Sequence, residues 1–178
     1  MQLNCKEFYF ARHGETDNNV QGLVTGSVDM PLNQNGINQA QLAADFVKGL
    51  PISRTVCSRL DRAYKTATLM LAQTAIQPIL TDGLEERNWG RLENTPKDNL
   101  DRYSFTEMGV ELWDEYIERT RATLAKLDFS TPLFIVAHSG TFRALCDCLN
   151  IKIEKRPVRN AWPYRFYQED DEWFVEEC

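Results

Sequence analysis

Histidine is scarce in this sequence, because His13 and His138 are the only two among 178 residues. Two histidines cannot supply a histidine-rich zinc site or a two-metal cluster, so we expect no metal and no cofactor. Cysteine is also limited to five scattered residues, and the pair Cys146 and Cys148 lacks the two-residue spacer of zinc and redox motifs. We therefore expect reduced thiols, with that pair buried on a helix.

Long hydrophobic runs, a signal sequence and a basic surface are missing as well. No apolar stretch approaches the roughly 18 residues that span a bilayer. The first seven residues show no basic stretch followed by an apolar one, so no secretory signal is expected. The formal net charge is −6, whereas a nucleic-acid binder of this size is usually basic. These absences predict a cytoplasmic protein without membrane or nucleic-acid partners, and they leave its oligomeric state open.

The composition is that of a globular chain, with 43% hydrophobic and 26% charged residues. Strands are predicted at residues 8–11, 54–57, 79–81 and 133–137, with a terminal hairpin formed by 164–168 and 173–175. Helices are predicted over 37–50, from a cap at Ser58 to Met70, over 110–127, and from Gly140 to Leu149. The alternation predicts one α/β domain over residues 1–178, a three-layer α-β-α sandwich with a mostly parallel central sheet and a C-terminal hairpin.

Both histidines directly follow predicted strands. His13 comes after residues 8–11, and His138 comes after residues 133–137. Ligands of parallel sheets bind beyond the carboxyl ends of the strands, so both imidazoles are placed at the expected site. A neutral imidazole nitrogen can attack phosphorus, and the adjacent Arg12 can bind two phosphate oxygens at once. The pattern therefore indicates phosphoryl chemistry.

Several strings, in this order and spacing, resemble the motifs of one family. The first is Arg12-His13-Gly14-Glu15-Thr16, followed by Asn19, Gly26 and Asp29. The others are Cys57-Ser58-Arg59-Leu60-Asp61-Arg62-Ala63, Leu84-Glu85-Glu86, Val136-Ala137-His138-Ser139-Gly140, and Asn160-Ala161. Together they resemble the histidine phosphatase superfamily, also called phosphoglycerate mutase-like proteins, over nearly the whole chain.

The resemblance implies a role for each matching residue. His13 is implied as the nucleophile that transiently carries the phosphoryl group, and Arg12, Arg59 and His138 as a cationic cup around its oxygens. Glu86 is implied as the general acid, although a slip of one residue would exchange it with Glu85. The further residues expected to bind phosphate or substrate are Asn19, Thr25, Gly26, Arg62, Ser139 and Gly140. Arg62 is expected mainly to pin the pocket through an ion pair.

Other features separate the branches of the family. Leu23 stands where a basic residue is common, and Thr25-Gly26 is more similar to the mutase branch than to phosphatases. The long basic insertion of the mutases is missing, and few cations are expected outside the core pocket. The prediction is therefore metal-independent hydrolysis of a small phosphorylated metabolite through a phosphohistidine. The alternatives are a phosphoglycerate-type mutase and a catalytically weak domain that binds phosphorylated ligands.

Two further segments are expected near the pocket. Residues 94–108 are polar and are predicted to form part of a lid, in which Lys97 and Arg102 are expected to be solvated rather than bound to substrate. Arg119, on the long helix, is expected on a solvated face, and the alternative is that it supports the site from behind the residues that touch substrate.

Overall fold

The structure is a computed structural model that describes residues 3–97, 109–153 and 157–178. Its elements are β1 (Glu7–Arg12), α1 (Asp17–Val20), α2 (Gln34–Val47), β2 (Arg54–Cys57), α3 (Asp61–Met70), β3 (Pro78–Leu80), the 3-10 turn η1 (Gly90–Leu92), α4 (Trp113–Leu124), β4 (Leu133–Ala137), α5 (Ser139–Cys148), β5 (Pro163–Glu169) and β6 (Glu172–Glu177). Every predicted strand and helix is present, whereas α1 and η1 were not expected. Most of the predicted lid, including Arg102, lies outside the described residues.

The strands form one sheet in the order β3-β2-β4-β1-β5-β6. The pairs β3–β2, β2–β4 and β4–β1 are parallel, and β1–β5 and β5–β6 are antiparallel. The hairpin between β5 and β6 turns at Asp170 and Asp171, both with positive φ, as a tight two-residue hairpin requires. The mostly parallel sheet and the C-terminal hairpin are therefore confirmed.

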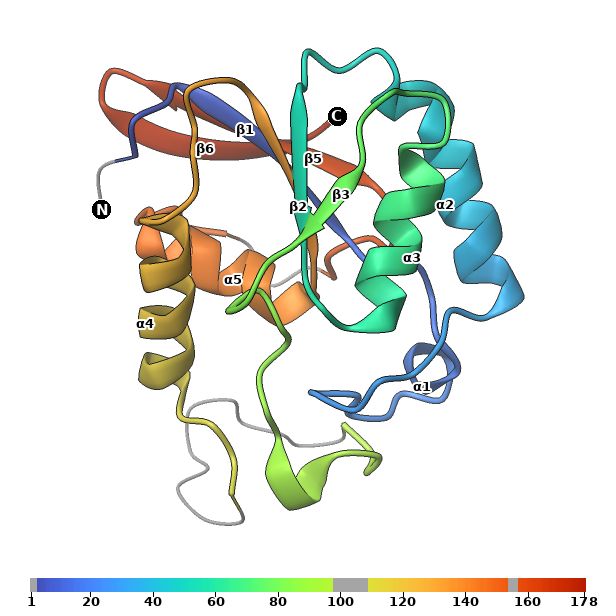
Figure 1. Cartoon of the computed structure of the whole chain (residues 1–178). Coiled ribbons are helices and arrows are strands. Elements are labelled where there is room, and N and C mark those ends of the chain that lie inside the picture. The colour runs from blue at the N-terminus through green and yellow to red at the C-terminus, as the bar shows by residue number, and fades with distance from the viewer. Residues whose placement is uncertain (1–2, 98–108, 154–156) are drawn as a thin grey trace.

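Helices cover both faces of the sheet, α2 and α3 on one side and α4 and α5 on the other (Figure 1). Successive side chains of a strand point to opposite faces, so β1 supplies both layers. Phe8 and Phe10 pack in the core under α4 and α5, whereas Tyr9 and Ala11 pack in the core under α2 and α3. All five residues of β4 are buried for the same reason. The predicted three-layer sandwich is confirmed.

Local signals explain where two helices begin. Asn33 caps α2, because its side chain accepts a hydrogen bond from the backbone N–H of Gly36, and the helix therefore starts before the predicted position. The predicted cap at Ser58 is wrong, since α3 begins at Asp61 after Leu60. The Ser58 hydroxyl instead lies 2.8 Å from Nε2 of His138. A residue that looked like a helix cap is thus a neighbour of the predicted site.

The cysteines agree with their prediction, since all five are free thiols and Cys146 and Cys148 are buried on α5. In the part of the chain that the structure describes, no helix is both long enough and apolar enough to cross a membrane.

Candidate active site

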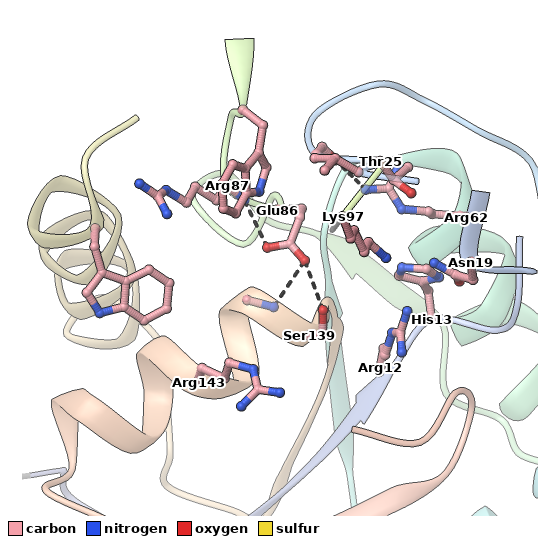
Figure 2. Close-up of a pocket in the computed structure, with 15 residues that line it drawn as sticks. Arg12, His13, Asn19, Thr25, Arg62, Glu86, Arg87, Lys97, Ser139 and Arg143 are labelled. Carbon is pink, nitrogen blue, oxygen red and sulfur yellow. Dashed lines mark hydrogen bonds between the residues drawn. The ribbon is translucent and has the colours of Figure 1, made fainter. Parts of the chain in front are cut away.

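A pocket of about 270 Å³ lies where β1 and β4 end side by side. Its lining brings together nine of the predicted residues, namely Arg12, His13, Asn19, Thr25, Gly26, Arg62, Glu86, Ser139 and Gly140 (Figure 2). These residues come from β1, from α1 and the loops on either side of it, from α3, from the segment after β3, and from the start of α5. Residues far apart in sequence thus converge on one cavity at the carboxyl end of the parallel strands.

His13 is buried and held in one ring orientation. Its backbone N–H donates to the carbonyl of Ala137 at 2.9 Å, which continues the pairing of β1 with β4. Its Nδ1 lies 2.7 Å from the carbonyl of Gly14, and only a protonated Nδ1 can donate there, so the lone pair is on Nε2. Burial, together with the charges of Arg12 and Arg62, lowers the pKa of His13 well below its ordinary value. The imidazole is therefore neutral and nucleophilic at neutral pH.

His138 lies beside it, with the two ring centroids 5.2 Å apart. Its side chain is completely buried, and it is not part of the pocket lining. Burial and the charge of Arg62 also lower the pKa of His138 well below its ordinary value. When Ser58 donates to Nε2, the ring proton lies on Nδ1, which has no hydrogen-bond partner among the described residues. This nitrogen is then an unused donor next to His13.

Arg12 and Arg62 place two guanidinium groups beside His13. One nitrogen of Arg12 donates to the carbonyl of Val158, whereas Arg62 donates to the carbonyls of Gly26 and Val28. The expected ion pair of Arg62 is wrong, because its fixed partners within the described chain are backbone carbonyls. The Nε groups of both arginines are buried and lack a hydrogen-bond partner among the described residues. Burial lowers the pKa of Arg12 to about 10, so it remains a cation at neutral pH.

Two smaller groups complete this side of the pocket. The Thr25 hydroxyl is buried in the lining and has no hydrogen-bond partner among the described residues. Asn19 accepts from the backbone N–H of Thr16 and from the side chain of Asn160, which also donates to the carbonyl of His13. Its own amide N–H₂ is therefore the group that remains for a ligand. Buried donors without partners are rare in proteins, and a set of them around one cavity indicates an anion site.

Arg59 does not join the pocket. Its guanidinium pairs with the carboxylate of Asp82, and about half of its side chain is exposed. Of the predicted cup, the structure brings Arg12 into the pocket lining together with Arg62, whereas Arg59 and His138 are not in that lining. The physical reason is that Arg59 lies before α3, whereas Arg62 lies in its first turn on the buried face.

The structure distinguishes Glu86 from Glu85. Glu86 lines the pocket, and its carboxylate accepts from the backbone N–H of Gly140 at 3.0 Å and from the Ser139 hydroxyl at 3.4 Å (Figure 2). Glu85 is not in the pocket lining, and its carboxylate accepts from the backbone N–H of Gly83. Gly140 was expected to bind phosphate or substrate, but its backbone N–H instead donates to the Glu86 carboxylate. A Cβ at position 140 would collide with that carboxylate, so the close approach requires glycine.

Three cations in the lining were not expected there, namely Arg87, Lys97 and Arg143. The expectation of few cations outside the core pocket is wrong in this respect. Lys97 reaches the pocket because segments 22–24 and 94–97 pair through their backbones, and its side chain is exposed there. Arg143 stands four residues after Ser139 on α5, and this helical spacing is the sequence signal that would have indicated it.

Arg119, on α4, is placed differently from its prediction. Its guanidinium donates to the Glu111 carboxylate at 2.8 and 2.9 Å and to the carbonyls of Gly83 and Glu85. The predicted solvated face is therefore wrong. Arg119 ties α4 to the segment that carries Glu86, and its spacing of three residues from the buried Tyr116 placed it on that side.

The two buried imidazoles predict acid sensitivity of the fold. Unfolding returns both to an ordinary pKa near 6.5, so the unfolded chain binds protons that the folded chain excludes. The free energy of unfolding is therefore greatest above that pH. It decreases as the pH falls, by up to about 2.7 kcal/mol per pH unit from the two groups. Denaturant unfolding between pH 7.5 and pH 5 measures this slope before most carboxylates titrate. A stability that is constant across this interval would contradict neutral burial of the histidines.

Comparisons with known proteins agree with this geometry. A model of the histidine phosphatase superfamily (branch 1) matches residues 8–177. The phosphatase PhoE of Bacillus subtilis is 33% identical over 139 residues, which are 75% of this chain and 72% of that protein. The adenosylcobalamin/alpha-ribazole phosphatase of Salmonella typhimurium is 27% identical over 176 residues, 90% of this chain and 85% of that protein.

A longer relative and a solved structure extend the comparison. The agropine synthesis reductase of Rhizobium rhizogenes is 30% identical over 96% of this chain, but the chain spans only 41% of that protein. The structure of a mycobacterial glucosyl-3-phosphoglycerate phosphatase superimposes with a TM-score of 0.81 at 25% identity, covering 97% of this chain and 98% of that chain. The chain belongs to the histidine phosphatase superfamily, branch 1, which confirms the family and the phosphatase class that the motifs predict.

Proposed function

We propose that this chain hydrolyses small phosphomonoesters through a phosphohistidine on His13, without a metal ion. One observation carries the proposal. A neutral imidazole with a free Nε2 lies among buried donors that lack partners in the described chain, namely the Nε groups of Arg12 and Arg62 and the hydroxyl of Thr25. This arrangement fits a phosphoryl group placed against Nε2.

In the first step, the Nε2 lone pair of His13 attacks phosphorus and the bond from phosphorus to the ester oxygen breaks. Glu86 gives its proton to that oxygen, which leaves as an alcohol. The positive charge formed on the imidazole is shared through Nδ1–H with the carbonyl of Gly14. Arg12 and Arg62 bind the phosphoryl oxygens, whose charge the transition state must stabilise.

In the second step, water attacks the phosphorus of the phosphohistidine. The Glu86 carboxylate accepts a proton from the water, the bond between phosphorus and nitrogen breaks, and its electron pair returns to Nε2. Inorganic phosphate leaves, and both groups regain their starting protonation. Splitting the reaction in this way lets one carboxyl group act first as an acid and then as a base.

The size and charge of the pocket support a small anionic substrate. A cavity of about 270 Å³ accommodates a phosphorylated metabolite, and among the described residues its lining holds five cationic side chains against one carboxylate. The acidic chain as a whole, with a formal charge of −6, thus concentrates positive charge at this cavity. Relatives named for the phosphatases of alpha-ribazole and glucosyl-3-phosphoglycerate are consistent with this substrate class.

The proposal is tested by phosphate release from a panel of phosphomonoesters with EDTA present. We expect turnover that the chelator does not change, and a phosphoprotein that is stable in base but labile in acid when the enzyme is quenched during turnover. Loss of activity with EDTA would contradict the metal-independent mechanism. Isomerised phosphoester without free phosphate would instead identify a mutase, and a folded but silent protein would indicate a binding role.

A further inference from the structure

The tyrosine at position 116 reaches Glu86 from a separate element. Tyr116 is fully buried on α4, where its ring packs edge-on against Trp113 and the guanidinium of Arg119 lies over it. Its hydroxyl lies 3.0 Å from Oε1 of Glu86 and 2.9 Å from Oγ1 of Thr141. A phenylalanine would fill the same space without the hydroxyl, so packing alone does not account for a tyrosine here.

The two oxygens of Glu86 have separate partners. Oε1 accepts from the backbone N–H of Arg87 at 3.0 Å and from the Tyr116 hydroxyl. Oε2 accepts from the backbone N–H of Gly140 and, at the longer distance of 3.4 Å, from Ser139. Each oxygen accepts from one backbone N–H at 3.0 Å, so these donors do not distinguish the two. The Ser139 hydroxyl, at 3.4 Å from Oε2, can rotate to accept a proton from that oxygen. Oε2 is therefore the oxygen better able to carry a proton.

The direction of the hydrogen bonds follows from charge. A carboxylate is a stronger acceptor than a neutral hydroxyl, so Tyr116 donates to Glu86 and accepts from Thr141. Burial and the nearby charge of Glu86 raise the pKa of Tyr116 well above its ordinary value, so the hydroxyl keeps its proton. The hydroxyls of Thr141 and Tyr116 thus form two successive hydrogen bonds that end on Oε1 of Glu86.

We propose that Tyr116 is a positioning residue for Glu86: its hydroxyl keeps Oε1 as an acceptor and thereby reserves Oε2 for the transferred proton. This inference rests on the proposed function, because it assigns no role to Tyr116 other than through the general acid. Tyr116 does not line the pocket and does not touch the substrate site. Its removal is expected to change proton transfer rather than substrate binding.

The charged groups that face the carboxylate are unchanged by a mutation at Tyr116. They are Arg12 from β1, Arg62 from α3 and Lys97 from the segment after η1, with Arg119 behind the tyrosine ring and Arg143 on α5. A shift in pH dependence after loss of the hydroxyl therefore reports that hydroxyl.

The experiment compares Tyr116→Phe with Tyr9→Phe, a change at another buried tyrosine, whose ring lies near Arg165 rather than at the site. For Tyr116→Phe we expect kcat on an alkyl phosphomonoester to fall about tenfold or more, with KM nearly unchanged, as for loss of a hydrogen bond to a charged group. On p-nitrophenyl phosphate, whose leaving group needs no proton, the loss should stay within about threefold. Tyr9→Phe should leave both rates unchanged.

The pH profile gives a second readout. The first step requires a protonated acid, so kcat/KM on the alkyl ester has an alkaline limb. Loss of a donor to the charged carboxylate disfavours the charged form, so Tyr116→Phe should move that limb to higher pH. Thr141→Val should move it in the same direction by less.

A double variant separates positioning from packing. In the Glu86→Gln background there is no carboxylic acid to position, so adding Tyr116→Phe should cost no further activity on the alkyl ester. An unshifted limb, equal losses on both substrates, or a full further loss in the Glu86→Gln background would overturn the role of Tyr116. Wild-type activity that does not depend on His13 would instead overturn the proposed function itself.

Discussion

Replacing His13 by alanine is expected to abolish phosphate release, with a loss of kcat on the order of 10⁴-fold or more. The reason is that the variant lacks the atom that forms the new bond to phosphorus. The surrounding donors of Arg12, Arg62 and Thr25 remain in place and still bind phosphate. Binding without turnover is thus the expected state of the variant, and it separates the nucleophile from the anion site.

Two measurements distinguish this outcome from loss of folding. Phosphate and vanadate should still protect the variant against thermal unfolding, whereas wild-type enzyme alone should yield an acid-labile phosphoprotein on quenching. His13→Ala should also weaken the acid sensitivity of the fold, since one of the two buried imidazoles is gone. Residual turnover above about one per cent of wild type would show that another group attacks phosphorus.

The fold was largely predictable because its core elements carry strong local patterns. Residues 133–137 are continuously apolar, as a strand covered on both faces must be, and its predicted bounds are those of β4. The acidic turn at Asp170 and Asp171 marked the hairpin. The short α1 was missed because three of its four residues, Asp17–Val20, are polar and show no apolar periodicity. The start of α1 is instead held by the Asn19 side chain, which accepts a hydrogen bond from the backbone N–H of Thr16.

The site was predictable where a residue follows directly from a strand end. His13 and His138 come at the ends of neighbouring parallel strands, so topology alone brings them together. Arg87 and Lys97 could not be predicted in this way, because their place in the lining depends on how loops fold back over the sheet. Arg143 did carry a signal, namely its helical spacing from Ser139. Lys97 in particular reaches the pocket through a backbone pairing of segments that are about 70 residues apart in sequence.

The choice between Arg59 and Arg62 also depends on a detail of the folded structure that sequence patterns do not reveal. Both lie in one motif, three residues apart, and both can bind phosphate by their chemistry. The sequence does not state where the helix begins, and a start at Asp61 decides that Arg62 lies on the buried face. Arg59 then lies outside, paired with Asp82.

Arg62→Met should therefore lower kcat/KM by about 10²- to 10³-fold, the usual effect of removing a preorganised donor from a developing charge. Arg59→Met is the matched control and should change kcat/KM by less than about threefold, because an exposed ion pair contributes little. Arg62→Lys keeps the charge but not the bonds to the carbonyls of Gly26 and Val28, and we expect it to recover only part of the loss.

Each variant must first be shown to fold, by circular dichroism and by its denaturant midpoint, because Arg62 is buried. A folded Arg62→Met protein with nearly normal turnover would exclude Arg62 from the phosphoryl site. An Arg59→Met protein with the larger loss would have a different meaning. It would show that the pair between Arg59 and Asp82 opens when substrate binds, and that the cup predicted from the motif forms only in the complex. The relative size of the two losses therefore decides which guanidinium stabilises the transferred phosphoryl group.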